Sequence, residues 1–187
     1  RPPRSTLSSS SAASDVYKRQ LFGDGAGAVV LGAEDNNGSN EDRGVLSTHI
    51  HSDGDYYKLL WTNGGPSTNG QAGYIEMEGA DVFKHAVLRM AETVQESLTE
   101  NDLDISDIDW LVPHQANIRI MDSVAKKLSI DKSKVVVTVD QHANTSAATI
   151  PMALADAQSR QCFSPGDLIS LTAMGGGFTW GSALIRW

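Results

Sequence analysis

Residues 109–117, Asp-Trp-Leu-Val-Pro-His-Gln-Ala-Asn, decide how the rest of the chain is interpreted. The apolar pair at 111–112 ends a short run that predicts a buried strand, and Pro113 ends it because proline cannot donate a ladder hydrogen bond. His114 therefore follows a strand end directly, just before a helical pattern that begins at Asn117. In an open α/β sheet, ligands bind at such a position. The imidazole is either a general base or hydrogen-bond donor, or a buried histidine satisfied by backbone.

Two further stretches put polar or glycine residues at strand ends. Asn144-Thr-Ser-Ala-Ala (144–148) follows 135–139, which predicts a buried parallel strand, and opens another helical pattern. Asn144 is therefore either a ligand-facing amide or a helix N-cap. The glycine-rich stretch 175–181, Gly-Gly-Gly-Phe-Thr-Trp-Gly, joins two predicted strands. Its three glycines allow backbone N–H groups to approach a ligand closely.

These blocks together resemble a known family. His-Gln-Ala-Asn (114–117), Asn-Thr-Ser-Ala-Ala (144–148) and Gly-Gly-Gly-Phe-Thr-Trp-Gly-Ser-Ala (175–183), in this order, are similar to the C-terminal part of β-ketoacyl-acyl-carrier-protein synthase III. That family is the condensing enzyme that starts bacterial-type fatty acid synthesis. Phe-Gly-Asp-Gly-Ala-Gly-Ala (22–28) looks like a further family block. The resemblance covers residues 21–187 and none before them.

The resemblance implies an α/β fold, a thiolase-like sandwich of two similar βαβαβ halves. We expect residues 74–187 to be the C-terminal half, residues 21–52 to be the last strands of the N-terminal half, and residues 53–73 to be a surface loop. Within the second of these segments, strands are expected at 28–31 and 45–51. Because these strands would lack their sheet neighbours, their exposed edges predict aggregation or non-native pairing.

Three helices are expected in the C-terminal half. The first follows a short strand expected at 74–77, runs for about 20 residues until Asn101-Asp102 breaks it, and has a buried stripe at helical spacing. The second follows Asn117, and the third runs from Asn144 to about Ser159, with Pro151 marking a kink or a late start. The stripe of the first helix is Phe83, Val87, Met90, Val94 and Leu98, and the inward residues of the second are Ile118, Met121, Val124, Ala125 and Leu128.

Residues 1–20 differ from the rest of the chain. They contain Pro-Pro, a serine run at 8–11 and almost no apolar periodicity. We expect them to be non-native or disordered, derived from cloning or a library and joined to a truncated reading frame. An organelle transit peptide is the alternative, but the first half of the enzyme should then follow it.

Composition narrows the function classes. The 187 residues fit one ordinary domain, and 40% hydrophobic content is enough for a core. A formal charge of −8 argues against nucleic-acid binding, and no apolar run is long enough for a membrane. The single Cys162 excludes an internal disulfide and fits a reducing cytoplasm. His49, His51 and Asp53 could form a metal site. The simpler interpretation is that the two imidazoles lie on a solvent-facing strand edge, so we predict no metal.

The resemblance also implies catalytic roles. In the family a cysteine thiolate takes an acyl group from acyl-CoA, and the acyl-enzyme condenses with malonyl-carrier protein, which loses carbon dioxide. His114 and Asn144 match the family's His and Asn, so they would donate neutral hydrogen bonds to the malonyl thioester carbonyl and stabilise the enolate. The N–H of Gly176 matches an oxyanion-hole donor. No cofactor is implied, since acyl-CoA and malonyl-carrier protein are substrates.

Binding residues follow in the same way. The implied partner is acyl carrier protein, which a local basic cluster would attract although the chain is acidic; a solvated charged face is the simpler account of that cluster. Family members are homodimers. One pantetheine contact is in doubt because Ala80 stands where the family usually has Asn. The implied tunnel residues are Met77, Gly79, Phe83, Ala116 and Asn117, and the implied docking residues are Lys84, Gln115, Ala116, Asn117, Ile118, Arg119, Lys126 and Lys127.

Cys162 does not match the family's nucleophile and has neither a helix N-terminus nor an adjacent histidine to activate it. We therefore expect this chain to be inactive in acyl transfer alone. Two alternatives remain open: another thiolase-fold synthase of the polyketide or hydroxymethylglutaryl-CoA type, and a noncatalytic fragment that binds the carrier protein.

Overall fold

The computed structural model describes residues 21–187, so our interpretation of residues 1–20 lies outside the described residues. Four strands form the main sheet, in the order β1-β6-β5-β4. Only β4 and β5 are parallel; the other two pairs are antiparallel. A separate two-stranded sheet pairs β2 with β3. The strands are β1 (Gly44–Ser52), β2 (Leu60–Thr62), β3 (Ile75–Met77), β4 (Trp110–Pro113), β5 (Leu168–Gly175) and β6 (Thr179–Arg186).

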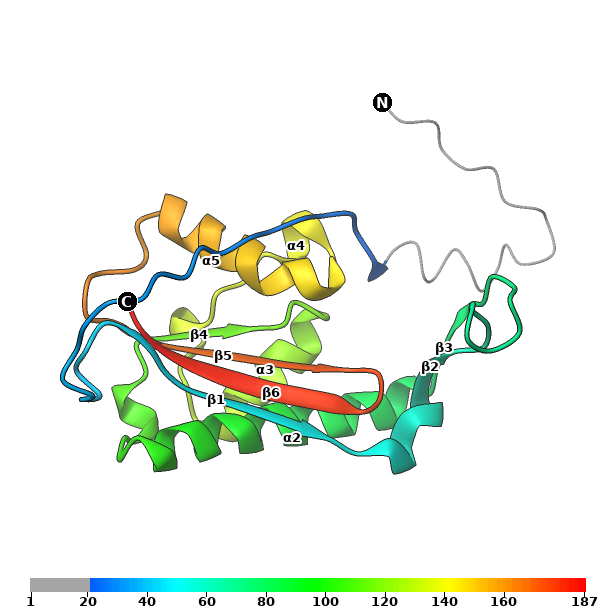
Figure 1. Ribbon diagram of the computed structural model, residues 1–187, viewed down its shortest axis with the longest axis horizontal. Coiled ribbons are helices and arrows are strands. Elements are labelled where there is room, and N and C mark those ends of the chain that lie inside the picture. Colours follow the sequence, from blue (N-terminus) through cyan, green and yellow to red (C-terminus); the bar gives the residue numbers. More distant parts are fainter. Residues whose placement is uncertain (1–20) are drawn as a thin grey trace.

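Helices cover both faces of the main sheet, as expected for a thiolase-like α/β fold (Figure 1). The long helix α2 packs on β5, β6 and α3, whereas α5 packs on β4 from the other side. No helix within residues 21–187 is long and apolar enough to cross a membrane. The α-helices are α2 (Gly79–Glu100), α3 (Ile118–Leu128), α4 (Val139–His142) and α5 (Thr149–Ser159), and the 3-10 helices are η1 (Gly54–Leu59), η2 (Ile105–Asp107), η3 (Lys132–Lys134) and η4 (Ser146–Ala148).

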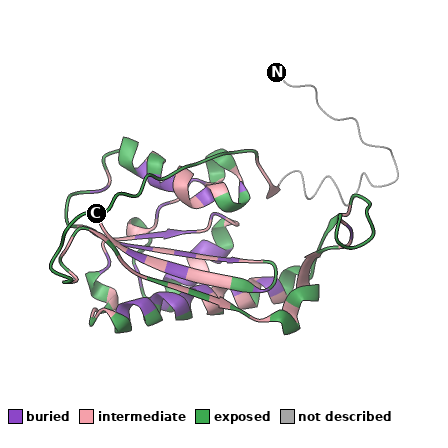
Figure 2. Ribbon diagram, in the orientation of Figure 1, coloured by how far each residue is buried: buried purple, intermediate pink, exposed green. Residues whose placement is uncertain are grey.

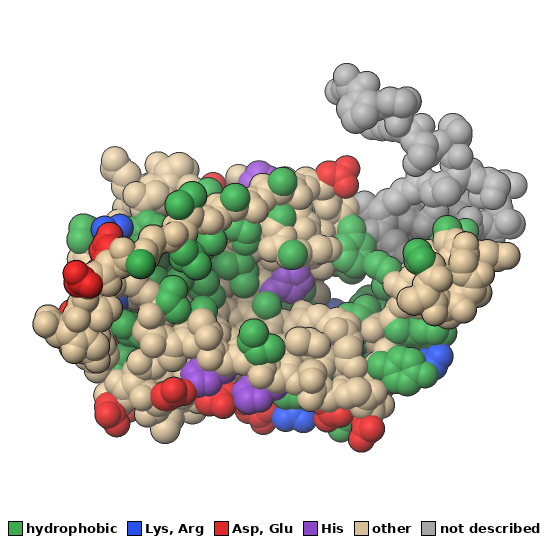
Figure 3. All heavy atoms as spheres, in the orientation of Figure 1, with side chains coloured by type: hydrophobic (Ala, Val, Ile, Leu, Met, Phe, Trp, Pro, Cys, Tyr) green, Lys and Arg blue, Asp and Glu red, His purple; other side chains and the backbone are tan. Residues whose placement is uncertain are grey.

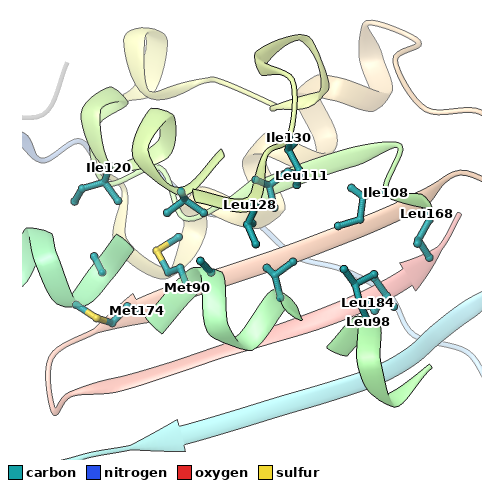
Figure 4. Packing of buried hydrophobic residues seen from close by; sticks show 14 of the residues in the cluster. Met90, Leu98, Ile108, Leu111, Ile120, Leu128, Ile130, Leu168, Met174 and Leu184 are labelled. Carbon is teal, nitrogen blue, oxygen red and sulfur yellow. The ribbon is translucent and has the colours of Figure 1, made fainter. Parts of the chain in front are cut away.

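Two cores lie on the two faces of this sheet. Neighbouring residues of one strand serve different cores, since strand side chains alternate between faces. Leu168 belongs to the core beneath α2 and α3, and Ile169 to the core beneath α5. Figure 2 shows the burial concentrated on the central strands and the inner helix faces, and Figure 4 shows Met90, Leu98 and Leu128 converging on the sheet. β4 and β5 are therefore buried on both sides, which explains the apolar sequence of β4, while β5 also buries Ser170 and Thr172.

The helix of about 20 residues expected before Asn101 is confirmed as α2, but its buried face is rotated from the predicted stripe. Val82 and Ala86 are buried, while Phe83 and Val87 are only partly buried against the core. The face also includes Thr93, which is 1% exposed and hydrogen-bonds Ser182 at 3.0 Å. A prediction based only on apolar residues misses a buried threonine such as Thr93, because a hydroxyl that is hydrogen-bonded can be buried in a core.

The second helix is confirmed with one wrong residue. Ile118 was expected to point inward, yet it is 45% exposed, and Ile120 takes the buried place. For the third helix, the late start is confirmed. A 3-10 turn precedes α5, and Pro151 lies in the first turn of α5, where a missing backbone N–H costs nothing.

The expected strand at 28–31 is wrong. Residues 23–37 have no strand, and Val29, Val30 and Leu31 are exposed. The glycines before them instead pack closely on α5, where the segment crosses it (Figure 1). An added Cβ would lie 2.5 Å from the Met152 sulfur at Gly25 and 2.7 Å from Pro151 at Gly27. Glycine is therefore needed at these positions because the backbone passes close to α5, and not because the chain turns into a strand.

The strand expected at 45–51 exists and keeps one neighbour, although its outer edge is unpaired among the described residues. β1 pairs antiparallel with β6 along its whole length, so the prediction of an unpaired remnant is wrong for this strand. The strand expected at 135–139 is also wrong. Val135 forms a single bridge with Leu111, and α4 begins at Val139. The surface loop expected at 53–73 contains η1 and β2.

The two histidines of β1 face α2. His51 Nε2 lies 2.7 Å from Glu96, and His49 Nε2 lies 3.2 Å from Glu100. The His49 side chain is only 10% exposed, so its predicted solvent-facing position is wrong. Asp53 accepts a hydrogen bond from the Asp55 N–H and caps η1. Within residues 21–187, no group of three metal-ligating side chains comes together. The pairs therefore attach β1 to α2.

Candidate functional site

His114 lies directly after β4, as the strand-end rule predicts. Its backbone N–H donates to the Thr172 carbonyl at 2.8 Å, which extends the β4–β5 pairing by one residue. Its ring Nδ1 lies 2.6 Å from the Thr149 hydroxyl at the start of α5. Among the described residues, Nε2 has no hydrogen-bond partner. The ring is thus fixed from one side and available to a ligand on the other.

Asn144 is held by three backbone groups. Its own N–H donates to the Leu21 carbonyl and its own carbonyl accepts from the Gly23 N–H, both at 3.0 Å. Its side-chain Oδ1 accepts from the Ser146 N–H at 2.9 Å. Because Oδ1 is engaged, the amide group that remains for a ligand is the Nδ2 donor. Asn144 is not the N-cap of α5, which is Ala148, so that alternative is wrong.

One cavity of about 1260 Å³ brings these two side chains together. His114 and Asn144 both line it, as does Gly176, although 62 residues separate the first from the last. All five expected tunnel residues line it too: Met77, Gly79, Phe83, Ala116 and Asn117. Most of the wall is apolar, as in a site that binds a small molecule and orients it with a few polar groups. Figure 3 shows the surface hollowed between the main body and the β2–β3 hairpin, with apolar side chains beside the hollow.

The glycine-rich turn reaches the cavity because its first residues carry no side chain. A Cβ on Gly176 would lie 2.9 Å from the Leu60 carbonyl oxygen, so this close approach requires glycine. Phe178 anchors the turn: it is fully buried, and its ring stacks at 5.9 Å from Tyr56. Its backbone also exchanges two 2.8 Å hydrogen bonds with Asp53. Gly176 is thereby held against the cavity wall by a rigid neighbour.

Burial lowers the pKa of His114 below its ordinary value, and no charged neighbour contributes to the shift. The ring is therefore neutral at pH 7 when the cavity is empty. The pKa of His114 is lower in the folded state than in the unfolded state. This group therefore makes its full contribution to stability at pH values above the ordinary histidine pKa, where the ring is neutral. That contribution is lost as the pH falls from the ordinary pKa toward the lowered one.

The expected docking residues separate into exposed and buried ones. Arg119 is exposed, with its guanidinium 5.7 Å from the Phe83 ring at the cavity wall. Gln115 is 1% exposed, so its expected docking role is wrong. Its side chain bonds the backbone of residues 113, 136, 138 and 139 instead. The other exposed ones are Lys84, Ile118, Lys126 and Lys127, while Ala116 and Asn117 are partly buried, and Asn117 also caps α3.

Cys162 lies away from this cavity. It follows α5, is partly buried, and packs against the core that contains Val112 and Phe163. It is not among the described residues that line the cavity. Sequence reasoning missed Thr149, the ring partner of His114, and the wall residues Trp61 and Ile75. The last two lie in β2 and β3, around a stretch rich in Gly, Asn and Ser that gives little periodic signal.

Comparison with known proteins gives two family matches. Residues 98–187 match the model described as 3-oxoacyl-[acyl-carrier-protein (ACP)] synthase III C terminal, and residues 5–54 match 3-oxoacyl-[acyl-carrier-protein (ACP)] synthase III. The second match begins at residue 5, so the expectation that the resemblance covers no residue before 21 is wrong, whereas the non-native origin of residues 1–20 stays a prediction.

Individual relatives agree with these matches. The chain is 59% identical over 166 residues to a β-ketoacyl-[acyl-carrier-protein] synthase III of Paramagnetospirillum magneticum, covering 89% of this chain and 51% of the relative. It is 58% identical over 167 residues to that of Rhodospirillum centenum, with the same coverage. The crystal structure of the Pseudomonas aeruginosa PAO1 synthase III superposes with a TM-score of 0.83 at 40% identity, covering 91% of this chain and 52% of that one.

The chain thus spans about half the length of the curated relatives it matches. Both family models, the sequence relatives and the superposed fold agree on one assignment. The chain belongs to the 3-oxoacyl-[acyl-carrier-protein] synthase III family.

Proposed function

We propose that the protein serves β-ketoacyl-acyl-carrier-protein synthase III chemistry, the decarboxylative condensation of malonyl-carrier protein with an acyl-CoA primer of the acetyl-CoA type. This reaction starts fatty acid synthesis. We also propose that the protein is located in the cytoplasm. The observation that carries the proposal is the shared cavity of His114 and Asn144. Each has one side-chain nitrogen without a partner among the described residues, and the surrounding wall is apolar. The proposed reaction uses no metal ion and no organic cofactor.

The chemistry at these two residues is loss of carbon dioxide from a malonyl thioester. The bond between the thioester's α-carbon and its carboxylate breaks, and the electron pair moves into the enolate, whose negative charge falls on the former carbonyl oxygen. Hydrogen bonds to that oxygen are stronger in the transition state than in the substrate, so they speed the reaction. The Nδ2 donor of Asn144 suits this role because its carbonyl end is already engaged. An apolar wall strengthens the bond by excluding water.

One sample with two substrates tests this proposal. Incubated with malonyl-CoA, the chain should release carbon dioxide and acetyl-CoA faster than a protein-free control, because the enolate site is present. Incubated with acetyl-CoA, its intact mass should stay unchanged, because Cys162 is the only cysteine and lies outside the cavity wall. Absence of decarboxylation in a folded sample would overturn the proposed role of the cavity. A stable acetyl adduct on Cys162 would overturn the expectation of no acyl transfer.

We further propose that acyl carrier protein docks at the cavity mouth on an exposed basic cluster, Lys84, Arg119, Lys126 and Lys127. The observation in favour is position, since Arg119 lines the cavity that would receive the carrier's pantetheine arm. Carrier binding without turnover is the second candidate function, and it rests on the same cluster.

Replacing Arg119 or Lys126 by alanine should weaken carrier-protein binding about two- to fivefold each, as for exposed charges at the rim of an interface. Titration calorimetry or fluorescence anisotropy with acyl carrier protein measures the change, and added salt should weaken wild-type binding as well. Arg160→Ala is the matched control, because Arg160 is also exposed but lies outside the cavity wall and is paired with Asp156 on α5. Equal affinities for all four proteins would contradict this docking surface.

A further inference from the structure

Thr149 is in contact with both His114 and the turn that carries Asn144. It is 2% exposed, and its hydroxyl lies 2.6 Å from His114 Nδ1 and 2.9 Å from the Ser146 carbonyl oxygen. Neither the family resemblance nor the matched blocks assign this side chain a role. Its two contacts are short enough that both need a hydrogen between the heavy atoms.

The number of hydrogens decides which group donates. A threonine hydroxyl has one hydrogen to donate, and a carbonyl oxygen can only accept. The hydroxyl hydrogen of Thr149 therefore belongs to the bond with the Ser146 carbonyl. The contact with His114 must then be made by a hydrogen on the ring, donated from Nδ1 to the Thr149 oxygen. The opposite assignment would leave two oxygens 2.9 Å apart with no hydrogen between them.

We infer that Thr149 is a positioning residue that holds the neutral His114 ring in its Nδ1–H form, so that Nε2 presents a lone pair to the cavity. A neutral imidazole has one N–H, and here it faces α5 instead of the ligand. Asn144 is then the only neutral side-chain donor of the pair. His114 donates to an oxygen in the cavity only after Nε2 has taken up a proton.

This changes the role expected for the histidine. The family resemblance implied two neutral donors at the thioester oxygen. The threonine contact instead makes His114 a proton acceptor in the empty cavity and a charged donor once protonated. Burial opposes that protonation in the empty cavity, whereas an enolate oxygen favours it. The proton taken up at Nε2 would therefore accompany the negative charge that appears on the thioester oxygen.

Few other ionisable groups face the ring. Of the described residues lining the cavity, the others are Tyr57 and Arg119. The α2 residues on the wall are Gly79, Val82, Phe83, Ala86 and Met90, which do not ionise. The turn at 144–148 has no ionisable side chain, and Asp156 of α5 is paired with Arg160. The pH response of the site should therefore follow His114.

Nitrogen-15 NMR of the whole chain tests the inference without using activity. Long-range proton–nitrogen spectra distinguish a protonated ring nitrogen from an unprotonated one, and loss of signals in His114→Gln identifies the ring among the five histidines. Above neutral pH, wild type should be protonated at Nδ1. Thr149→Ser, which keeps a hydroxyl, should match it, whereas Thr149→Val should lose the preference. A proton on Nε2 in wild type overturns the inference, as does an unchanged tautomer in Thr149→Val.

The pH dependence of malonyl-CoA decarboxylation adds a second measurement, which rests on the proposed function. The wild-type rate should fall about tenfold per pH unit above the pKa of His114, because the charged donor is lost. Thr149→Val should show a weaker dependence, since its neutral ring can donate from Nε2. Equal profiles for both proteins would contradict the inference. If no variant decarboxylates while the spectra are as expected, the proposed function fails and the tautomer assignment stands. If Thr149→Val does not fold, the wild-type and Thr149→Ser spectra still decide the matter.

Discussion

His114→Ala and Asn144→Ala should each lower the rate of malonyl-thioester decarboxylation by about 10²–10³-fold, the usual loss when one donor to a developing oxyanion is removed; for His114 that donor is the ring protonated at Nε2. Both side chains reach the same cavity, and each has one nitrogen left for a ligand among the described residues. The loss should appear in kcat more than in KM, because these bonds strengthen as the enolate forms. Release of carbon dioxide from malonyl-CoA, measured at saturating substrate, reports the effect.

The double variant separates a shared role from two independent ones. If both groups act on one oxygen, removing both should cost little more than removing the more important one. His142→Ala and Asn36→Ala are matched controls, because both side chains are exposed and neither lines the cavity. Their rates should equal that of wild type. A double variant whose loss equals the product of the single losses would contradict a shared oxygen.

The sequence located His114 because it lies where a buried strand meets a helical pattern, which is a position where ligands bind at the edge of an α/β sheet. Asn144 was located by the same pattern although residues 135–139 form no strand, so its place in the site was supported only by the resemblance to the family block at 144–148. Thr149 could not be found in this way. Its bond to His114 joins residues 35 apart and depends on how α5 packs against β4. Nothing in the local pattern distinguishes it from any other threonine near a helix start.

The two strands that were predicted but are absent, at 28–31 and 135–139, have one physical explanation. A run of Val and Ala forms a strand only when another strand offers hydrogen-bond partners, and this requirement is invisible in local sequence. Residues 28–31 meet no such partner within the described chain, so they form no regular secondary structure and are exposed. Val45–His51 does meet one, because β6 runs alongside it. The prediction of aggregation now rests on the exposed Val29, Val30 and Leu31 and on the outer edge of β1.

The family resemblance assigned Gln115 to the docking surface, but it is buried. Its replacement should have the largest effect on stability of the changes that we consider. The side chain follows His114 but points into the protein, where its Nε2 donates to the Pro113 and Val136 carbonyls. Its Oε1 accepts from the Thr138 and Val139 N–H groups, at 2.8 and 3.2 Å. One buried amide thus supplements the single bridge between Val135 and Leu111, and it fixes the approach to α4.

Gln115→Ala should therefore lower the free energy of unfolding by about 3–5 kcal/mol, because it leaves buried N–H groups unpaired and opens a cavity. For a domain of this size that corresponds to a fall in Tm of about 10 °C. Gln95→Ala on the exposed face of α2 is the control and should change stability by less than about 0.5 kcal/mol. Urea unfolding followed by circular dichroism measures both.

Gln115→Glu distinguishes lost hydrogen bonds from lost volume. The glutamate keeps the shape and one accepting oxygen, but it turns the second oxygen toward the Pro113 and Val136 carbonyls, which can only accept. At neutral pH it should destabilise the fold at least as much as alanine, although it leaves no cavity. At acidic pH the protonated carboxyl can donate to one of those carbonyls, so its deficit relative to wild type should shrink. A Gln115→Glu protein as stable as wild type at pH 7 would mean that the amide donors contribute nothing. The segment at 135–139 would then be held by the bond from the Val136 N–H to the Leu111 carbonyl and by the bonds that Oε1 accepts, and Asn144, which follows it, would not depend on the amide donors of Gln115 for its position.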